Sequence, residues 1–142
     1  VVPNFALGAV LMMHFAELAA KWMPHCEILE LHHDRKADAP SGTASLTAHR
    51  IAAARPTAPL AREELIKAEG VRGGTVHGVT VHSVRLPGLV AHQKVLFGGP
   101  GETLTVAHDS HDRTSFMEGV ALCARRVRSL KGLTIGMDSL LF

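Results

Sequence analysis

Tyrosine is absent from this chain of 142 residues, tryptophan occurs once, and aromatic residues make up only 4% of the sequence. The formal net charge at pH 7 is +2, and lysine and arginine form no cluster with interleaved aromatic residues. A strongly basic surface of that kind is typical of proteins that bind nucleic acid. The composition therefore argues against a nucleic-acid partner and against electrostatic attraction to an anionic membrane surface.

Cysteine is also scarce, because Cys26 and Cys123 are the only two, and their separation is typical of neither a metal site nor a redox motif. We therefore expect reduced thiols and a cytoplasmic protein. Asn4, His14 and Glu17 interrupt the apolar N-terminus, which has no basic leader, so it predicts an amphipathic helix rather than a membrane span. With 46% hydrophobic and 20% charged residues, the chain has the composition of one folded domain.

The chain lacks an initiator methionine and opens on Val1-Val2, which resembles the end of a buried strand, so we expect a fragment of a larger fold. It also lacks the G-x-G-x-x-G turn, between a strand and a helix, with which dinucleotide-binding domains hold a pyrophosphate. Its glycine clusters, at 70–74 and 98–101, lie between strand-like segments. We therefore expect no Rossmann domain within this sequence.

Apolar spacing and turn residues predict an α+β fold, with a mixed or antiparallel sheet of about four strands flanked by helices. The predicted helices span about 6–23, 41–55 and 113–130, and the predicted strands span 26–33, 78–86, 89–97 and 102–110. Short turns between the last three strands favour antiparallel connections, and a surface excursion with one helical turn around 62–68 is expected between 56 and 75. The apolar stripe predicted for the first helix consists of Leu7, Val10, Leu11, Leu18 and Trp22, and it is widened by Met12, Met13 and Phe15.

The segment "LHHDRKADAPSGTA", residues 31–44, concentrates titratable groups directly before a predicted helix. The first N–H groups of a helix have no partner inside it and attract anions. Gly42 lets a ligand approach those groups closely and Thr43 adds a hydroxyl donor, although the same residues also fit an ordinary helix cap. Lys36 offers a positive charge to a carboxylate, and a histidine titrates near neutrality, as a general acid should.

Two interpretations of the paired histidines follow from the residues alone. A metal site with His32 and His33 needs a third ligand, and Arg35 and Lys36 would repel a cation bound beside Asp34 or Asp38. If the loop instead brings these groups together with the helix start, the pocket suits a small molecule with two carboxylates and an atom awaiting a proton. We favour the dianion site and predict no metal.

The longer string "ELHHDRKADAPSGTA" resembles the signature of the 4-hydroxy-tetrahydrodipicolinate reductases, or dihydrodipicolinate reductases, of lysine and diaminopimelate synthesis. That signature is close to Glu-x-His-His-x-x-Lys-x-Asp-x-Pro-Ser-Gly-Thr-Ala, and every fixed position matches. "VVPNFALGAVLMM" resembles the family's passage from cofactor domain to substrate domain, and "HDRTSF" resembles the start of its late helix. The resemblance runs over essentially the whole chain and looks closest to the actinobacterial members.

The resemblance implies reduction of 4-hydroxy-tetrahydrodipicolinate to tetrahydrodipicolinate, with a hydride from NADH or NADPH and a proton supplied by the protein. It implies His32 as proton donor and acceptor and Lys36 as a second proton donor. It also implies that the substrate carboxylates are held by His33, Gly42 and Thr43. The implied cofactor contacts are Val2, Pro3, Asn4, Phe5, Arg113 and Phe116.

Residues 1–142 would then form the substrate-binding, catalytic and oligomerisation domain. Residues 1–5 would be the hinge to a nucleotide-binding domain, and about 113–142 would be a helix and tail that pack against it. Relatives form homotetramers through this sheet, and 89–97 is apolar on both faces, which suits a sheet covered by helices on one side and another subunit on the other. Without the cofactor domain we expect weak cofactor binding and little turnover.

Two alternatives stay open beside the reductase. The first is a non-catalytic assembly or binding module that retains the dicarboxylate pocket. The second is a metal-dependent hydrolase that uses His32 and His33.

Overall fold

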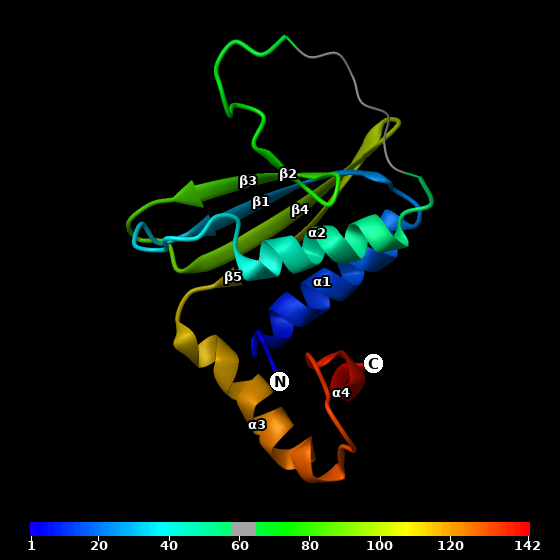
Figure 1. The fold of residues 1–142 in the computed structure, drawn as a ribbon, viewed down its shortest axis with the longest axis vertical. Coiled ribbons are helices and arrows are strands. Elements are labelled where there is room, and N and C mark those ends of the chain that lie inside the picture. Colours follow the sequence, from blue (N-terminus) through cyan, green and yellow to red (C-terminus); the bar gives the residue numbers. More distant parts are fainter. Residues whose placement is uncertain (58–64) are drawn as a thin grey trace.

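The computed structural model describes residues 1–57 and 65–142, whose arrangement is drawn in Figure 1. In chain order the elements are α1 (Leu7–Ala20), β1 (His25–His32), α2 (Gly42–Ala54), β2 (Gly74–Val76), β3 (Val79–Arg85), β4 (Ala91–Gly99), β5 (Glu102–Ser110), η1 (Arg113–Phe116), α3 (Met117–Arg126), η2 (Val127–Ser129) and α4 (Asp138–Leu141). The first two helices and four of the strands lie within a few residues of their predicted positions. The predicted helix over 113–130 is divided into a 3₁₀ turn, an α-helix and a second 3₁₀ turn.

The sheet is mixed, as predicted, and its five strands lie in the order β2-β3-β1-β4-β5. β1 pairs with β3 in parallel, and the other three pairings are antiparallel. The chain leaves β1 through α2 and returns as β3, and such a crossover produces a parallel neighbour. β4 then takes the free side of β1, so the expected β4–β5 hairpin is present, whereas β3 and β4 are separated by β1.

The segment 56–75 holds one strand that the sequence did not predict. The short β2 begins at Gly74 and pairs with β3, which brings the sheet to five strands rather than about four. The helical turn expected around 62–68 falls partly outside the described residues, because 58–64 are not described. Its described part, 65–68, is not helical.

Helices α1 and α2 pack side by side against one face of the sheet, as Figure 1 shows. Alanines line the contact, since Ala16, Ala20, Ala44 and Ala48 are completely buried. Small side chains let helix axes approach each other and the sheet closely. The larger core residues come from α2 and the strands, and they include Ile28, Ile51, Val79, Val95 and Phe97. Each fully buried side chain of this size stabilises the fold by about 1.5–3 kcal/mol.

The buried face of α1 agrees only in part with the predicted stripe, through Val10, Met12 and Met13. Its buried residues are Ala9, Val10, Met12, Met13, Ala16 and Ala20. Leu18 and Trp22 are exposed by 43% and 87%, so the prediction that they face the core is wrong. The reason is steric, because the close contact with α2 selects alanine over larger apolar side chains at the interface.

The C-terminal segment returns to the N-terminus and to α2. The Arg50 guanidinium donates two hydrogen bonds to Asp138, at 2.6 and 2.8 Å, and this pairing holds the pKa of the Asp138 carboxyl below its usual value. The amino group of Val1 donates to the carbonyl of Thr134. A second apolar cluster contains Met12, Met13 and Met137. Within the described ranges, no helix combines the length and apolar character needed to cross a membrane.

Gly119 makes the attachment of α3 testable. A Cβ atom at this position would overlap the backbone carbonyl of Phe5, so α3 lies directly on the N-terminal segment. Gly119→Ala should therefore lower the free energy of unfolding by about 1–3 kcal/mol through overpacking. Urea unfolding followed by circular dichroism measures this loss. Gly74→Ala is the control, because its Cβ would meet nothing within 4 Å. Equal stability of the two variants would contradict the packing.

Candidate functional site

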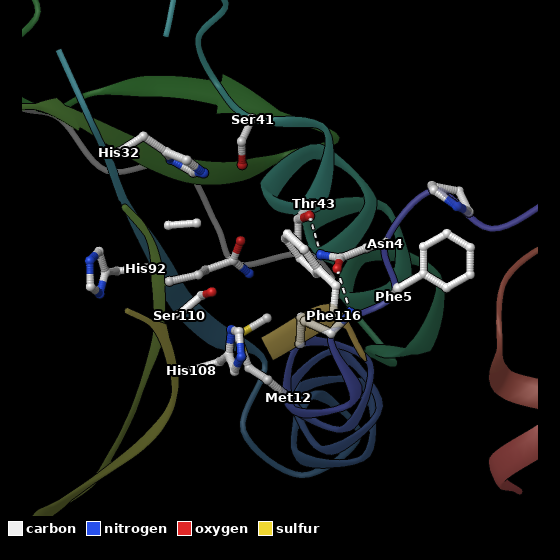
Figure 2. Close-up of a pocket in the computed structure, with 15 residues that line it drawn as sticks. Asn4, Phe5, Met12, His32, Ser41, Thr43, His92, His108, Ser110 and Phe116 are labelled. Atoms are coloured by element: carbon white, nitrogen blue, oxygen red, sulfur yellow. Dashed lines mark hydrogen bonds between the residues drawn. The ribbon is translucent and has the colours of Figure 1, made fainter. Parts of the chain in front are cut away.

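Two adjoining cavities lie where β1 ends, α2 begins and the N-terminal segment passes. The larger has a volume of about 520 Å³ and the smaller about 330 Å³. Their shared lining makes them one continuous site, and it consists of Pro3, Asn4, His32, Ser41 and Thr43. Figure 2 shows the smaller cavity, with His32 and Ser41 on one side and Asn4 and Phe5 on the other.

The residues that the sequence predicted for chemistry lie around this site, with one exception. His32, Lys36, Gly42 and Thr43 all line the larger cavity. His33 follows the last residue of β1 and is not among the residues lining either cavity. The Nδ1 atom of His33 is buried and has no hydrogen-bond partner among the described residues.

The predicted cofactor contacts are divided between different places. Pro3, Asn4, Phe5 and Phe116 line the smaller cavity. Val2 lines a separate apolar cavity under α3, and Arg113 is not among the residues lining any of these three. The geometry thus brings the N-terminal segment and the start of the late helix to the site, but not every residue of the predicted set.

The start of α2 presents unpaired donors to the larger cavity. Ser41 is the N-cap, since its hydroxyl accepts from the N–H of Ala44 at 3.2 Å and its carbonyl accepts from Ser45 at 3.0 Å. Gly42 and Thr43 are the first two helical residues and have no earlier carbonyl within the helix to bond. A Cβ at position 42 would point into open space, so glycine leaves room for a ligand there.

Thr43 has its hydroxyl hydrogen available for a ligand because of Asn4. The side-chain oxygen of Asn4 accepts from the N–H of Ala6 at 2.9 Å, so its amide nitrogen must face the other way. That nitrogen donates to Oγ1 of Thr43 at 3.2 Å, and both contacts appear as dashed lines in Figure 2. A hydroxyl that already accepts a hydrogen bond is free to donate its own hydrogen.

Lys36 and Asp38 form an ion pair at the rim of the site, with 2.7 Å between Nζ and Oδ1. The ammonium of Lys36 lowers the pKa of Asp38 below its usual value. Exposed pairs of this kind are weak, because solvent screens them. An anionic ligand can therefore compete with Asp38 for the ammonium.

His32 contacts a buried carboxylate on its own strand. Its Nδ1 lies 2.5 Å from Oε2 of Glu30, whose side chain is completely buried. Arg85 donates to both oxygens of that carboxylate, at 2.9 and 2.8 Å. Burial lowers the pKa of His32 below its ordinary value, and the hydrogen bond to Glu30 offsets only part of this effect. His32 is therefore mainly neutral at pH 7 before a ligand binds.

Sequence reasoning missed the sheet side of the site. Gln93, His92, His108 and Ser110 line the smaller cavity from β4 and β5. Gln93 was detectable as a polar residue at an inward position of β4, between an alanine and the buried Val95. Burial lowers the pKa of His108, which favours its neutral form.

The orientation of Gln93 follows from a chain of hydrogen bonds. The hydroxyl of Thr47 donates to the carbonyl of Thr43 at 2.7 Å, so it can only accept from Gln93. Nε2 of Gln93 is the donor, at 2.8 Å. The Oε1 atom consequently faces away from α2, and it is buried without a partner among the described residues. The smaller cavity therefore contains one buried acceptor that a ligand N–H or O–H can satisfy.

Comparison with known proteins identifies the architecture. Residues 8–141 match the family model described as "Dihydrodipicolinate reductase, C-terminus". The 4-hydroxy-tetrahydrodipicolinate reductases of Moorella thermoacetica and Mycolicibacterium smegmatis are 55% and 58% identical to the chain, over 99% of its length. The chain belongs to the dihydrodipicolinate reductase family.

A solved structure of a dihydrodipicolinate reductase supports the same assignment. That protein, from Paenisporosarcina sp. TG-14, is described as dipicolinate-bound, and its chain is 52% identical with a TM-score of 0.91 over 99% of this chain. The present chain covers 53% and 58% of the two reductases above and 54% of the solved chain. It thus spans a little over half the length of these dihydrodipicolinate reductases, and the described residues contain no Rossmann domain.

The metal-dependent alternative has no supporting geometry in this dihydrodipicolinate reductase domain. Among residues 1–57 and 65–142, no group of three or more His, Cys, Asp and Glu side chains is placed to hold a metal ion. His32 contacts a carboxylate that already accepts two hydrogen bonds from an arginine. The two histidines do not converge, because only His32 lines the cavities.

The hydrogen-bond chain through Thr47 gives a stability prediction. Thr47→Val keeps the shape of a completely buried side chain but leaves the amide of Gln93 without its acceptor. We expect the free energy of unfolding to fall by about 1–3 kcal/mol, measured by urea unfolding. Thr57→Val, at an exposed position after α2, should change the free energy of unfolding by less than about 0.5 kcal/mol.

A double variant separates this hydrogen bond from general packing effects. Thr47→Val combined with Gln93→Leu removes both partners. The free energy of unfolding that the double variant loses should therefore be smaller than the sum of the losses in the two single variants. Strict additivity would mean that the two side chains do not act together.

Proposed function

We propose that this chain is the substrate-binding and catalytic half of a 4-hydroxy-tetrahydrodipicolinate reductase, which makes tetrahydrodipicolinate in lysine and diaminopimelate synthesis. The observation that carries the proposal is the convergence of His32, Lys36, Gly42 and Thr43 on one cavity. A histidine, an ammonium and free helix-terminal amides match a cyclic dianion that needs a proton. Support also comes from the family assignment and from the dipicolinate-bound relative.

The two ends of the cavity have complementary roles in this proposal. One carboxylate of the ring meets the N–H groups of Gly42 and Thr43 and the Thr43 hydroxyl, because none of these groups donates a hydrogen bond to another described residue. The ammonium of Lys36 leaves Asp38 and pairs with the second carboxylate of the ligand, whose negative charge it neutralises. Interactions between charged donors and acceptors of this kind contribute about 1.5–3 kcal/mol each. His33 is retained as a substrate contact only as a sequence-based proposal, since it lies outside the two cavities.

His32 is the proposed proton donor and acceptor, with Lys36 as the second donor. A bound dianion raises the pKa of a nearby imidazole, because an opposite charge favours the protonated form. His32 therefore takes up a proton when the substrate binds and holds it beside the ring. Positioning of this kind, rather than new covalent chemistry, is the contribution of the domain.

NADH or NADPH supplies the hydride when bound. Pro3, Phe5 and Phe116 give the smaller cavity flat apolar walls, and the Gln93 oxygen gives it a buried acceptor, which together fit a ring bearing an amide. Its volume of about 330 Å³ suits one such ring rather than a dinucleotide. The rest of the cofactor is assigned to a nucleotide-binding domain, with residues 1–5 as the hinge to it and about 113–142 packed against it. Val2, in the hinge segment, and Arg113, in the C-terminal segment, are proposed to contact the cofactor at this domain boundary.

The proposed location is the cytoplasm. The two cysteines, Cys26 and Cys123, are both free thiols, and burial raises the pKa of Cys26 to about 11, which suppresses its thiolate. Free and unreactive thiols are typical of proteins in a reducing compartment.

Binding of dipicolinate by the isolated chain tests the proposed site. Lys36→Ala should weaken dipicolinate binding about 10- to 100-fold, because one charge-assisted contact is lost. Isothermal titration calorimetry measures the affinity, and the thermal stabilisation by the ligand should fall in parallel. Lys21→Ala, at the exposed end of α1, is the control and should bind like the parent chain.

Two outcomes would count against the proposal. Equal affinity of the Lys36→Ala and Lys21→Ala variants would mean that the ammonium does not contact the ligand. Absence of any dipicolinate binding by the parent chain would mean that it has no dicarboxylate pocket, as in a pure scaffold.

We also propose a homotetramer built through the face of the sheet opposite to α1 and α2. β4 alternates cleanly, with Gln93, Val95 and Phe97 buried under the helices and Lys94 and Leu96 facing the other side. Leu96 is 44% exposed in the single chain. A sheet that is apolar on both faces is normally covered on both.

Leu96→Glu tests this assembly. A charge at the centre of a closely packed face should shift the chain from tetramer to smaller species, because burying an unpaired carboxylate costs several kcal/mol. Size-exclusion chromatography with light scattering gives the mass. Trp22→Glu is the control, because Trp22 is 87% exposed at the end of α1. An unchanged mass for Leu96→Glu would exclude this face from the interface.

A further inference from the structure

Glu30 is a buried carboxylate beside the site to which no role has yet been given. We infer that Glu30, fixed by Arg85, is a positioning residue that holds the His32 imidazole with its Nδ1 hydrogen toward the carboxylate, so that Nε2 is the atom that exchanges a proton with the ligand. This inference deepens the proposed function and rests on it for the identity of the ligand.

The carboxylate of Glu30 is held from three elements. Its Oε1 accepts from Arg85 on β3 at 2.8 Å and from the N–H of Ser41, the N-cap of α2, at 3.3 Å. Its Oε2 accepts from Arg85 at 2.9 Å and faces His32 Nδ1 at 2.5 Å. Because both oxygens are bonded on several sides, the carboxylate is held in one orientation.

The protonation of the carboxylate then decides the tautomer of His32. Burial acts to raise the pKa of Glu30, but the hydrogen bonds from Arg85, Ser83 and His32 and the Arg85 charge bring it below its usual value. An ionised carboxylate can only accept hydrogen bonds. Nδ1 of His32 must therefore carry a hydrogen and donate it to Oε2.

The remaining ring nitrogen is left for the ligand. His32 lines both cavities, and Figure 2 shows its side chain directed from β1 toward Ser41. Nε2 of His32 has no hydrogen-bond partner among the described residues. A neutral imidazole with hydrogen on Nδ1 offers Nε2 as a base, and the protonated ring offers Nε2–H as an acid. A third group that orients the base in this way is a recurring feature of proton-transfer sites.

Stability alone does not account for the buried pair of Glu30 and Arg85. Moving two charges out of water costs several kcal/mol per ion, and apolar replacements of similar volume are often equally stable. A partly buried histidine with a carboxylate on one nitrogen has a fixed ring plane, a fixed tautomer and a higher pKa than the same buried ring would have without the carboxylate. These are the properties that a proton donor and acceptor requires.

The charged groups around His32 act in both directions. Glu30, on the same strand, raises the pKa of His32, whereas Arg85 from β3 and Lys36 from the following loop lower it. His92 and His108 line the smaller cavity from β4 and β5. Removing the charge of Glu30 while leaving these other groups in place should therefore lower the pKa of His32 further.

Glu30→Gln gives a specific structural prediction. The NH2 group of the new glutamine can take the place of Oε1, where it would meet Ser41 N–H and Arg85, which are both obligatory donors. It can instead take the place of Oε2, where it would meet Arg85 and His32. Of these neighbours only the imidazole can become an acceptor, by changing its tautomer. The NH2 group should therefore turn to His32 and donate to Nδ1. The hydrogen of the neutral ring then moves to Nε2, and the base toward the ligand is lost.

Nitrogen-15 NMR of histidine-labelled, ligand-free chain measures the tautomer and the pKa of His32 directly. The parent chain should show hydrogen on Nδ1 in the neutral ring. Glu30→Gln should show it on Nε2, with a lower pKa of His32 and about tenfold weaker dipicolinate binding near neutral pH. Because a protonated His32 attracts the dianionic ligand, dipicolinate binding by the variant should recover as the pH falls through the lowered pKa of His32.

Glu27→Gln is a matched control on the same strand. Glu27 also contacts a histidine and an arginine, with His82 Nε2 at 2.7 Å and Arg72 Nη2 at 2.5 Å, but its side chain is 35% exposed on the opposite face of the sheet. This variant should leave the tautomer and pKa of His32 and the dipicolinate affinity unchanged.

The outcomes separate this inference from the proposed function. Hydrogen on Nε2 in the neutral parent ring would overturn the inference without any variant, even if Glu30→Gln failed to fold. An unchanged His32 tautomer in a folded Glu30→Gln chain would also overturn it and would leave Glu30 a structural anchor. Lack of dipicolinate binding by a parent chain with the expected tautomer would instead count against the proposed function.

Discussion

The carboxylate of Glu30 is the point on which the geometry of the site depends. It accepts hydrogen bonds from the end of β3 through Arg85 and from the first turn of α2 through Ser41, and it contacts His32 at the end of β1. β1, β3 and α2 are therefore joined at one buried group, and two of the residues that contact it, His32 and Ser41, line the larger cavity. Because that group is charged, it also fixes the direction of each hydrogen bond it makes.

Directionality continues through the neutral hydrogen bonds of the site. Asn4 must donate to Thr43 because its oxygen is bonded to a backbone N–H, and Gln93 must donate to Thr47 because that hydroxyl donates to a carbonyl. The consequence is a cavity with defined polarity. The start of α2 presents donors, which suit carboxylates, and the sheet presents the acceptor of Gln93, which suits a ligand N–H or O–H.

The two faces of the sheet have different roles. The face under α1 and α2 forms the core and, at the ends of β1, β4 and β5, the floor of the site. The other face is uncovered in the single chain and carries Leu96. A mixed sheet permits this division, because the parallel pair β1–β3 is connected through α2 on one side only. Chemistry and the proposed assembly can therefore use separate surfaces.

Local sequence predicted most of the elements and part of the site. Alternation in 26–33, the Pro-Ser-Gly-Thr helix start and the spacing of His32, Lys36 and Thr43 were enough to predict that these groups share one cavity, because they are within a dozen residues of each other. The short β2, the buried face of α1 and the place of His33 could not be predicted in this way. A three-residue strand carries little periodic signal, and the preference for alanine over leucine on α1 arises from its contact with α2.

Tertiary structure alone decided how the site residues are oriented. Arg85 is 55 residues from Glu30, and Gln93 is 46 residues from Thr47, so no local pattern shows that they meet. The sequence determined which groups can donate, accept or carry a charge. The fold determined which of their atoms are already bonded, and the atoms left over define what the cavity can bind.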